Sequence, residues 1–199
     1  DGSSCTGDDG GTEGPYYVVN LEDTGNTSLH IFNDSITGLE IGDEIGVFDL
    51  NGVIENCVPP SMGGDCDPAT ETQYGEVLVA SHVWDGFQAD VVSIISVDQT
   101  GFSGPILNGA IEGNPVVIRI YRPSEELEYA TNVTFGAGTG SFGDLFQTIT
   151  EVTLTDVIEE ISGCTDIDAC NYDEYAMVDD GSCFYAEENY DCDGSCIVD

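Results

Sequence analysis

The chain has 199 residues, with 39 Asp or Glu, two Arg (Arg119 and Arg122) and no Lys, which gives a formal net charge of -37. Such a chain cannot neutralise phosphates or release their counterions, which excludes nucleic acid as a partner, and the same charge argues against docking on anionic lipid. It is typical of a calcium-rich exterior, where divalent ions relieve self-repulsion. A halophilic surface is the alternative, but it leaves the cysteines unexplained. No apolar run reaches the 18 residues of a membrane span, so we expect no membrane insertion.

Eight cysteines, an even number, predict disulfides and an oxidising compartment. They are Cys5, Cys57, Cys66, Cys164, Cys170, Cys183, Cys192 and Cys196. A zinc site is disfavoured, because no Cys-x-x-Cys pair occurs and the surrounding carboxylates oppose thiolate formation. We expect Cys57 and Cys66, in one Pro/Gly-rich loop, to pair with each other. Cys5 is expected to bridge to the tail, its own or a neighbour's, and the remaining connectivity stays open.

The chain order predicts three parts: a flexible acidic arm (1–15), a β-rich domain (16–160) and a Cys/Asp-rich tail (161–199). Short runs of β-branched and aromatic residues, punctuated by Gly and Pro, predict about nine or ten strands. The clearest are Tyr16–Leu21, Ser28–Phe32, Gly42–Asp49, Val53–Cys57, Gly75–Trp84, Asp90–Val97, Val116–Arg122, Leu127–Phe135 and Phe146–Leu154. We therefore expect an all-β fold, an antiparallel β-sandwich of Greek-key or jelly-roll type, followed by an irregular disulfide-rich, Asp-rich tail.

Three local patterns add detail to this expectation. The Asn51-Gly52 pair predicts a tight hairpin with both turn residues at positive φ. The near-continuous apolar run VVSIISV, within Asp90–Val97, predicts a strand covered on both faces. Thr153–Ser162 is compatible with a short helical turn, but its Val, Ile and Thr residues favour a strand.

The tail contains GCTDIDACNYDEYAMVDDGSC, Gly163 to Cys183, continued by FYAEENYDCDGSC to Cys196. These residues resemble a GCTD–ACNY–DDGSC repeat of large secreted proteins of aquatic bacteria, especially the Bacteroidota. The resemblance implies an extracellular location and an array-like architecture, and it implies no enzymatic activity. In such proteins the chain normally continues, so Asp199 need not be a natural end.

The segment from Gly42 to Leu154 is similar to a β-sandwich module of the same secreted proteins. It carries GDEIGVFDLNG, VWDGFQADVVSI, GNPVVIRIY and FGAGTGSFGDLFQTITEVTL. There the module often accompanies adhesion, cell-surface or sorting modules. Its Gly and aromatic positions imply architecture and no binding residues.

The tail has few apolar residues with which to offset the entropy of ordering, about 1–2 kcal/mol per residue. If it is ordered, we expect disulfides together with bound cations or a docking surface to fix it. Calcium takes six to eight oxygen ligands, and the candidate ligands are Asp166, Asp168, Asp179, Asp180, Asp191 and Asp193. None completes an EF-hand loop. The alternative is a solvated acidic linker held by disulfides alone.

Covalent glycans are a second modification to consider. Three Asn-x-Ser/Thr sequons place candidate sites at Asn26, Asn33 and Asn132, although chance accounts for one or two of them. Asp34-Ser35-Ile36 looks like a short Bacteroidota motif for O-linked sugars, which makes Ser35 a candidate.

Catalytic signals are weak. Neither a Gly-x-Ser-x-Gly turn nor His-Glu-x-x-His occurs, and the carboxylate pairs are too abundant to mark a glycosidase site. His30 and His82 are expected to be surface or satisfied core residues, and Trp84 is expected to pack in the core or at an edge.

We expect a non-enzymatic, secreted structural subunit that forms a fibre, filament or adhesive appendage with copies of itself, through docking of the tail or strand addition by Tyr16–Leu21. The alternative is a carbohydrate-binding or adhesin module of a larger secreted protein; an enzyme is the least favoured hypothesis.

Overall fold

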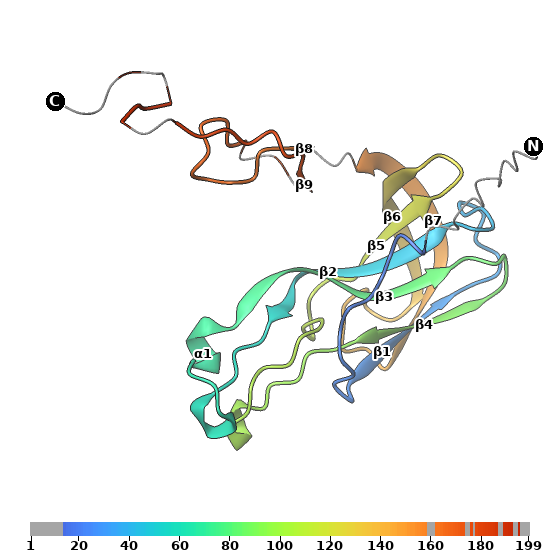
Figure 1. Ribbon diagram of the computed structural model, residues 1–199. Helices are drawn as coiled ribbons and strands as arrows, with labels where there is room; N and C mark the ends of the chain where they lie inside the picture. Colours follow the sequence, from blue (N-terminus) through green and yellow to red (C-terminus); the bar gives the residue numbers. More distant parts are fainter. Residues whose placement is uncertain are drawn as a thin grey trace, which may run out of the picture. The chain divides into compact units, whose positions relative to one another are not determined.

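The protein is described by a computed structural model, which covers residues 14–158, 162–173, 176, 178–186, 189–192 and 195 (Figure 1). The chain divides into two compact units, Asp1–Val157 and Ile158–Asp199. We call these the β-rich unit and the C-terminal unit and describe each by itself. The division falls beside the boundary that the sequence predicts after residue 160. Most of the predicted arm, 1–15, lies outside the described residues.

The regular secondary structure of the β-rich unit is almost entirely strand, with three short helical turns. In chain order the elements of the whole chain are β1 (Thr27–Phe32), β2 (Glu44–Glu55), η1 (Pro60–Met62), α1 (Pro68–Glu71), β3 (Gln73–Val83), β4 (Ala89–Ile94), η2 (Thr100–Phe102), β5 (Val117–Arg122), β6 (Leu127–Ala137), β7 (Phe146–Ile158), β8 (Ser162–Gly163) and β9 (Val178–Asp179). The predicted all-β class is confirmed. Thr153–Ser162 is a strand as far as Ile158, and residues 159–161 lie outside the described part.

Strands β1 to β7 form one sheet in the order β3-β2-β5-β6-β7-β1-β4. The pairs β1–β4, β2–β3, β2–β5 and β5–β6 are antiparallel, whereas β1 and β7 are parallel. The expectation of a purely antiparallel arrangement is therefore wrong at one pair. A β-sandwich of two packed sheets is not confirmed, because these seven strands are hydrogen-bonded into a single sheet.

One apolar core is shared by strands from all parts of the sheet. Ile45 of β2 pairs with Ile120 of β5, and both side chains are fully buried in this core. The edge strands β3 and β4 also contribute to it, through residues such as Val79 and Val91. Because strands at both ends of the sheet share one core, the sheet curls around it. Trp84 is 2% exposed, which confirms its predicted packing role.

The segment after residue 14 covers the outer face of the same sheet. The Tyr17 N–H donates to Glu44 Oε2 at 3.1 Å, and its hydroxyl donates to Glu128 on β6 at 2.6 Å. Tyr16 stacks on Tyr121 of β5 with ring centroids 3.8 Å apart. Gly46 permits this packing, because a Cβ there would lie 2.9 Å from the Tyr17 ring. The predicted strand Tyr16–Leu21 is thus wrong, and its tyrosines are held by the chain's own sheet.

The predicted hairpin at Asn51-Gly52 is also wrong, because both residues lie inside the continuous strand β2. The register against β3 shifts between Asp49 and Gly52, which marks a β-bulge. Asp49 Oδ1 accepts a hydrogen bond from the Asn51 N–H at 2.9 Å, and Oδ2 accepts from the Ile111 N–H at 2.8 Å. The pair therefore bends a strand around a buried carboxylate instead of reversing the chain.

The apolar run VVSIISV forms an edge strand and not one covered on both faces. In β4 exposure alternates: Val91 and Ser93 are buried, whereas Val92 is 53% exposed. Composition alone did not reveal this, because Val92 is apolar although it lies on the exposed face of the strand.

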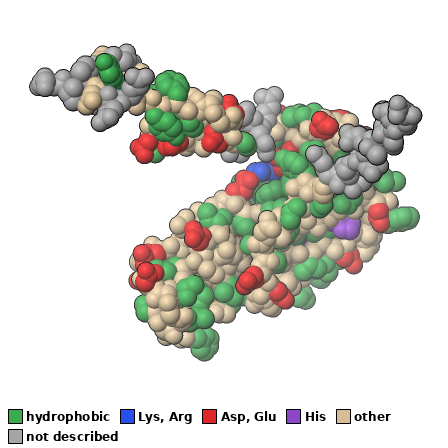
Figure 2. All heavy atoms as spheres, viewed as in Figure 1, with side chains coloured by type: hydrophobic (Ala, Val, Ile, Leu, Met, Phe, Trp, Pro, Cys, Tyr) green, Lys and Arg blue, Asp and Glu red, His purple; other side chains and the backbone are tan. Residues whose placement is uncertain are grey.

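Both arginines of the chain are engaged in ion pairs. Arg122 donates to Asp43 through Nε at 3.0 Å and Nη2 at 2.8 Å, and Asp43 is 1% exposed. Arg119 donates to both carboxylate oxygens of Glu76 at 2.7 and 2.6 Å. Figure 2 shows acidic and apolar side chains interspersed over the visible face of the β-rich unit. Neither guanidinium is free for an anionic ligand.

Candidate interaction site

The C-terminal unit is built from the cysteines and from the motif residues around them. Disulfides join Cys164 to Cys183 and Cys170 to Cys192. The Asn171 side chain links the two halves of the motif: its Nδ2 donates to the Ser182 carbonyl at 2.9 Å, and its Oδ1 accepts from the Phe184 N–H at 2.9 Å. An amide that donates and accepts in this way replaces a pair of backbone hydrogen bonds. The GCTD–ACNY–DDGSC residues therefore hold this small unit together.

The acidic residues of the motif act as turn acceptors. Asp179 Oδ1 accepts from the Gly181 N–H at 3.0 Å, and Asp180 Oδ1 accepts from the Ser182 N–H at 2.8 Å. These are the local carboxylate turns that favour Asp before Gly and Ser. The hydrogen bonds from Ser182 lower the pKa of Asp180 below its ordinary value.

Two further predicted calcium ligands have the same kind of role. Asp166 Oδ1 accepts from the Asp168 N–H at 2.9 Å, and its Oδ2 accepts from the Tyr185 hydroxyl at 2.6 Å. The Tyr185 hydrogen bond lowers the pKa of Asp166 and raises the pKa of Tyr185. Asp191 Oδ1 accepts from the Ser195 N–H at 2.7 Å.

The described aspartates of the C-terminal unit do not gather into a three-carboxylate cluster with ligand atoms within 4.8 Å of one another. Asp193, Cys5 and Cys196 lie outside the described residues. Calcium binding and the bridge from Cys5 stay predictions.

An open groove of about 350 Å³ lies in the C-terminal unit. We call it the aromatic groove, and its lining residues are Cys170, Phe184, Tyr185, Ala186, Tyr190, Asp191 and Cys192. Phe184 and Tyr185 are each 55% exposed, and Tyr190 is 44% exposed. The Cys170–Cys192 disulfide fixes two of its walls. A small unit with too little chain to bury its aromatic residues thus leaves them exposed. Its three aromatic residues lie close together in the sequence, within Phe184–Tyr190, but the sequence alone does not show that they stay exposed around one groove.

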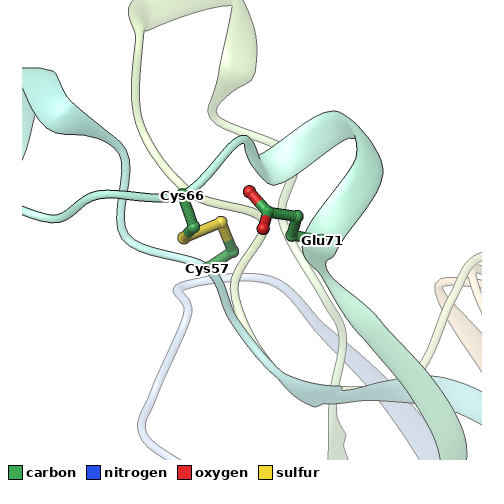
Figure 3. A group of neighbouring side chains, drawn as sticks. All are labelled: Cys57, Cys66 and Glu71. Atoms are coloured by element: carbon green, nitrogen blue, oxygen red, sulfur yellow. A yellow bond between two sulfur atoms is a disulfide. The ribbon is translucent and has the colours of Figure 1, made fainter.

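The third disulfide joins Cys57 to Cys66, as their spacing predicts, and the Glu71 carboxylate lies beside it (Figure 3). The three side chains are close enough to suggest a metal site. However, a thiolate is the metal ligand, and both sulfurs are oxidised. Glu71 instead accepts a hydrogen bond from the Asp67 N–H at the start of α1. The Cys57–Cys66 disulfide is therefore a structural cross-link of the loop that leads into α1.

His30 is a satisfied core residue, one of the two roles that the sequence predicts. Its Nε2 lies 2.8 Å from Ser93 Oγ, and its Nδ1 lies 3.0 Å from Gln147 Nε2. Both ring nitrogens therefore have a hydrogen-bond partner. Burial lowers the pKa of His30 from 6.5 to about 4, so the ring is neutral at pH 7. His82 lies on the edge strand β3, half-buried.

The predicted glycosylation sites differ in accessibility. Asn132 and Ser35 are exposed. Asn26 is half-buried, and its Nδ2 donates to Glu112 at 3.2 Å. Asn33 is half-buried in the turn after β1. Modification of Asn132 or Ser35 is thus the sterically simpler case, and all four sites stay predictions.

The fold and the site define an all-β protein with a small disulfide-bonded C-terminal unit that exposes an aromatic groove. Three disulfides among the described residues of the chain indicate an oxidising environment. In the part of the chain that the structure describes, no helix is long and apolar enough to cross a membrane. Comparison with protein-family models, curated proteins and solved structures yields no match to this chain.

Proposed function

We propose that this chain is a secreted, non-enzymatic structural subunit that assembles with copies of itself. The observation that carries the proposal is the aromatic groove, a concentration of exposed apolar side chains on a chain with a net charge of -37. Charge keeps such a chain soluble and dispersed, whereas an aromatic surface of this kind is typical of binding sites. The groove therefore serves as the point of contact between subunits, and docking of the tail is the mode of assembly that we favour over strand addition.

Calcium is part of this proposal as a screening cation. Carboxylates on neighbouring subunits repel one another, and divalent ions relieve this repulsion. Asp168, Asp179 and Asp180 are exposed and accessible to such ions. The disulfides have a different role from calcium: they do not affect the charge repulsion but hold the walls of the aromatic groove in place.

The experiment measures particle size by analytical ultracentrifugation and electron microscopy for the disulfide-intact full chain. Samples are compared before and after reduction, and before and after calcium chelation at matched ionic strength, since screening alone changes the repulsion. We expect oligomers or filaments that dissociate on reduction and shorten on chelation. A chain that stays monomeric in calcium, with its disulfides intact, contradicts the proposal.

A carbohydrate-binding module is the second candidate, and one surface of the β-rich unit favours it. A pocket of about 570 Å³ is lined by Tyr16, Tyr121, Glu44 and Glu126, among others. Aromatic rings beside carboxylates suit a sugar ring, with its apolar face and hydroxyl groups. Trp84 is buried and contributes nothing to such a site. A glycan-array screen with the wild type and Tyr16→Ala tests this: retention of a glycan by the wild type alone supports the module, and no bound glycan removes it.

A further inference from the structure

A second exposed apolar surface lies on the loops at the end of β2 and after β4. We call it the apolar tip, and it consists of Val58, Met62 and Phe102. Their exposed fractions are 41%, 61% and 93%, and no other large apolar side chain described is as exposed as Phe102. Met62 ends η1 and Phe102 ends η2, and the Ser61 hydroxyl joins the two turns by donating to the Ser103 carbonyl. Two loops far apart in sequence thus form one surface.

The backbone beneath the apolar tip is fixed on both loops. The Cys57–Cys66 disulfide closes the first loop, and within it the Gly64 N–H donates to the Pro59 carbonyl at 3.1 Å. In the second loop the N–H groups of Phe102 and Gly104 both donate to the Gln99 carbonyl at 2.9 Å. A preorganised surface loses less entropy on binding than a flexible one. The Cys57–Cys66 disulfide therefore stabilises a contact surface as well as the loop itself.

The charge pattern identifies which partner suits the apolar tip. Residues 58–64 (VPPSMGG) and 99–105 (QTGFSGP) contain no charged side chain, although about one residue in five of the chain is acidic. The aromatic groove contains one carboxylate, Asp191, among its lining residues. Two copies with a net charge of -37 repel each other least where uncharged surfaces meet. A partner recognised through charge would instead need acidic side chains on the tip.

We infer that the apolar tip of one copy docks into the aromatic groove of the next copy, with Phe102 as the inserted side chain. This inference rests on the proposed function and assigns the two surfaces that make the contact. The groove, at about 350 Å³, is larger than a single aromatic side chain. Because a protruding apolar group and its pocket occupy different surfaces, the contact is heterologous, and repetition of it produces an open chain of subunits.

The test uses four forms of the disulfide-intact full chain in sedimentation velocity, in the presence of calcium and at about 0.15 M salt, where the Debye length is about 8 Å. They are the wild type, the tip variant Phe102→Ser, the groove variant Tyr190→Ser and the control variant Phe87→Ser. Phe87 is a matched control because it is also an exposed phenylalanine, 71% exposed, in the turn after β3. Circular dichroism confirms that each variant is folded. A small interface is weak, so concentrations reach about 1 mM, where millimolar dissociation constants are measurable.

We expect Phe102→Ser and Tyr190→Ser each to weaken association about tenfold or more, as aromatic anchors do, and Phe87→Ser to behave as the wild type. Mixing the tip variant with the groove variant gives a further readout. Each retains one working surface, so the mixture should form 1:1 dimers and no longer chains. If the wild type assembles and Phe102→Ser assembles equally well, or if the mixture forms no dimer, the inference is wrong and the proposed function stands. If the wild type stays monomeric, both fail.

Discussion

Asn171 and Ser182 are joined by a hydrogen bond of 2.9 Å from the Asn171 Nδ2 to the Ser182 carbonyl, and the Asn171 Oδ1 accepts from the Phe184 N–H at the same distance. One side chain thereby connects the ACNY and DDGSC parts of the motif. It also positions Phe184, a wall of the aromatic groove. The order of the C-terminal unit and the shape of its binding surface therefore depend on the same residue.

Substitution Asn171→Ala should destabilise the C-terminal unit by about 1–2 kcal/mol, because two hydrogen bonds are lost. We expect the Phe184 amide to exchange its hydrogen about 5–30 times faster, as measured by native-state hydrogen exchange. Asn20→Ala is the control, since Asn20 is exposed in the β-rich unit and makes only a local contact at 3.4 Å. Unchanged exchange at Phe184 in Asn171→Ala contradicts this role.

Substitution Arg122→Met should lower the free energy of unfolding of the β-rich unit by about 3–5 kcal/mol, because it leaves the buried Asp43 carboxylate without its partner. The measurement is urea denaturation followed by Trp84 fluorescence. Glu76→Gln is the comparison, since it disturbs the pair with Arg119 at a carboxylate that is 42% exposed. There the expected loss is at most about 1 kcal/mol. Equal losses in the two variants would show that burial of the ion pair is unimportant.

Acid should destabilise the fold through His30. Its pKa is about 4 in the fold and 6.5 in the unfolded chain, so the unfolded state binds more protons between these values. The neutral ring's contribution is fully present above pH 6.5 and is lost as the pH falls towards 4. Each pKa unit is worth about 1.4 kcal/mol, so the change amounts to about 3 kcal/mol.

The measurement is the difference in unfolding free energy between the wild type and His30→Gln at pH 7 and at pH 4.5. Taking the difference removes the contribution of all other titratable groups, because they are the same in both proteins. We expect the wild type to lose stability relative to the variant as the pH falls. A difference that is constant with pH means that the ring does not titrate as its burial requires.

The double substitution Cys57→Ser and Cys66→Ser should free the loop beneath the apolar tip while the C-terminal unit stays intact. The expected cost is about 2–3 kcal/mol in the β-rich unit, because the disulfide closes only a short loop. Hydrogen exchange should accelerate at Met62 and Gly64, whose amides donate to Pro59. The Phe184 amide should be unaffected. An unchanged hydrogen-exchange rate at the Met62 amide would show that the turn does not depend on the Cys57–Cys66 disulfide.

Local composition was enough to predict the all-β class, the presence of disulfides and a change of character near residue 160. The signals were β-branched runs separated by Gly and Pro, the number of cysteines, and the density of Cys and Asp residues after that point. The Cys57–Cys66 pair was predictable for the same reason, since the two residues are neighbours in one loop. Trp84 was correctly expected in a packed position, and His30 has one of the two roles that were expected for it.

Other features depend on contacts between residues far apart in sequence, and these emerged only from the folded chain. Asn51-Gly52 favours a hairpin locally, but Asp49, Ile111 and the neighbouring strand β3 hold it in a bulge. Tyr16–Leu21 has the composition of a strand, but Tyr17 is anchored by Glu44 and Glu128 against the outer face of the sheet. The apolar tip is assembled from two loops far apart in sequence, and the aromatic groove is completed when the Cys170–Cys192 disulfide joins residue 170 to the segment 184–192. Composition shows the aromatic residues of that segment but not their exposure, because exposure depends on which parts of the folded chain pack against them.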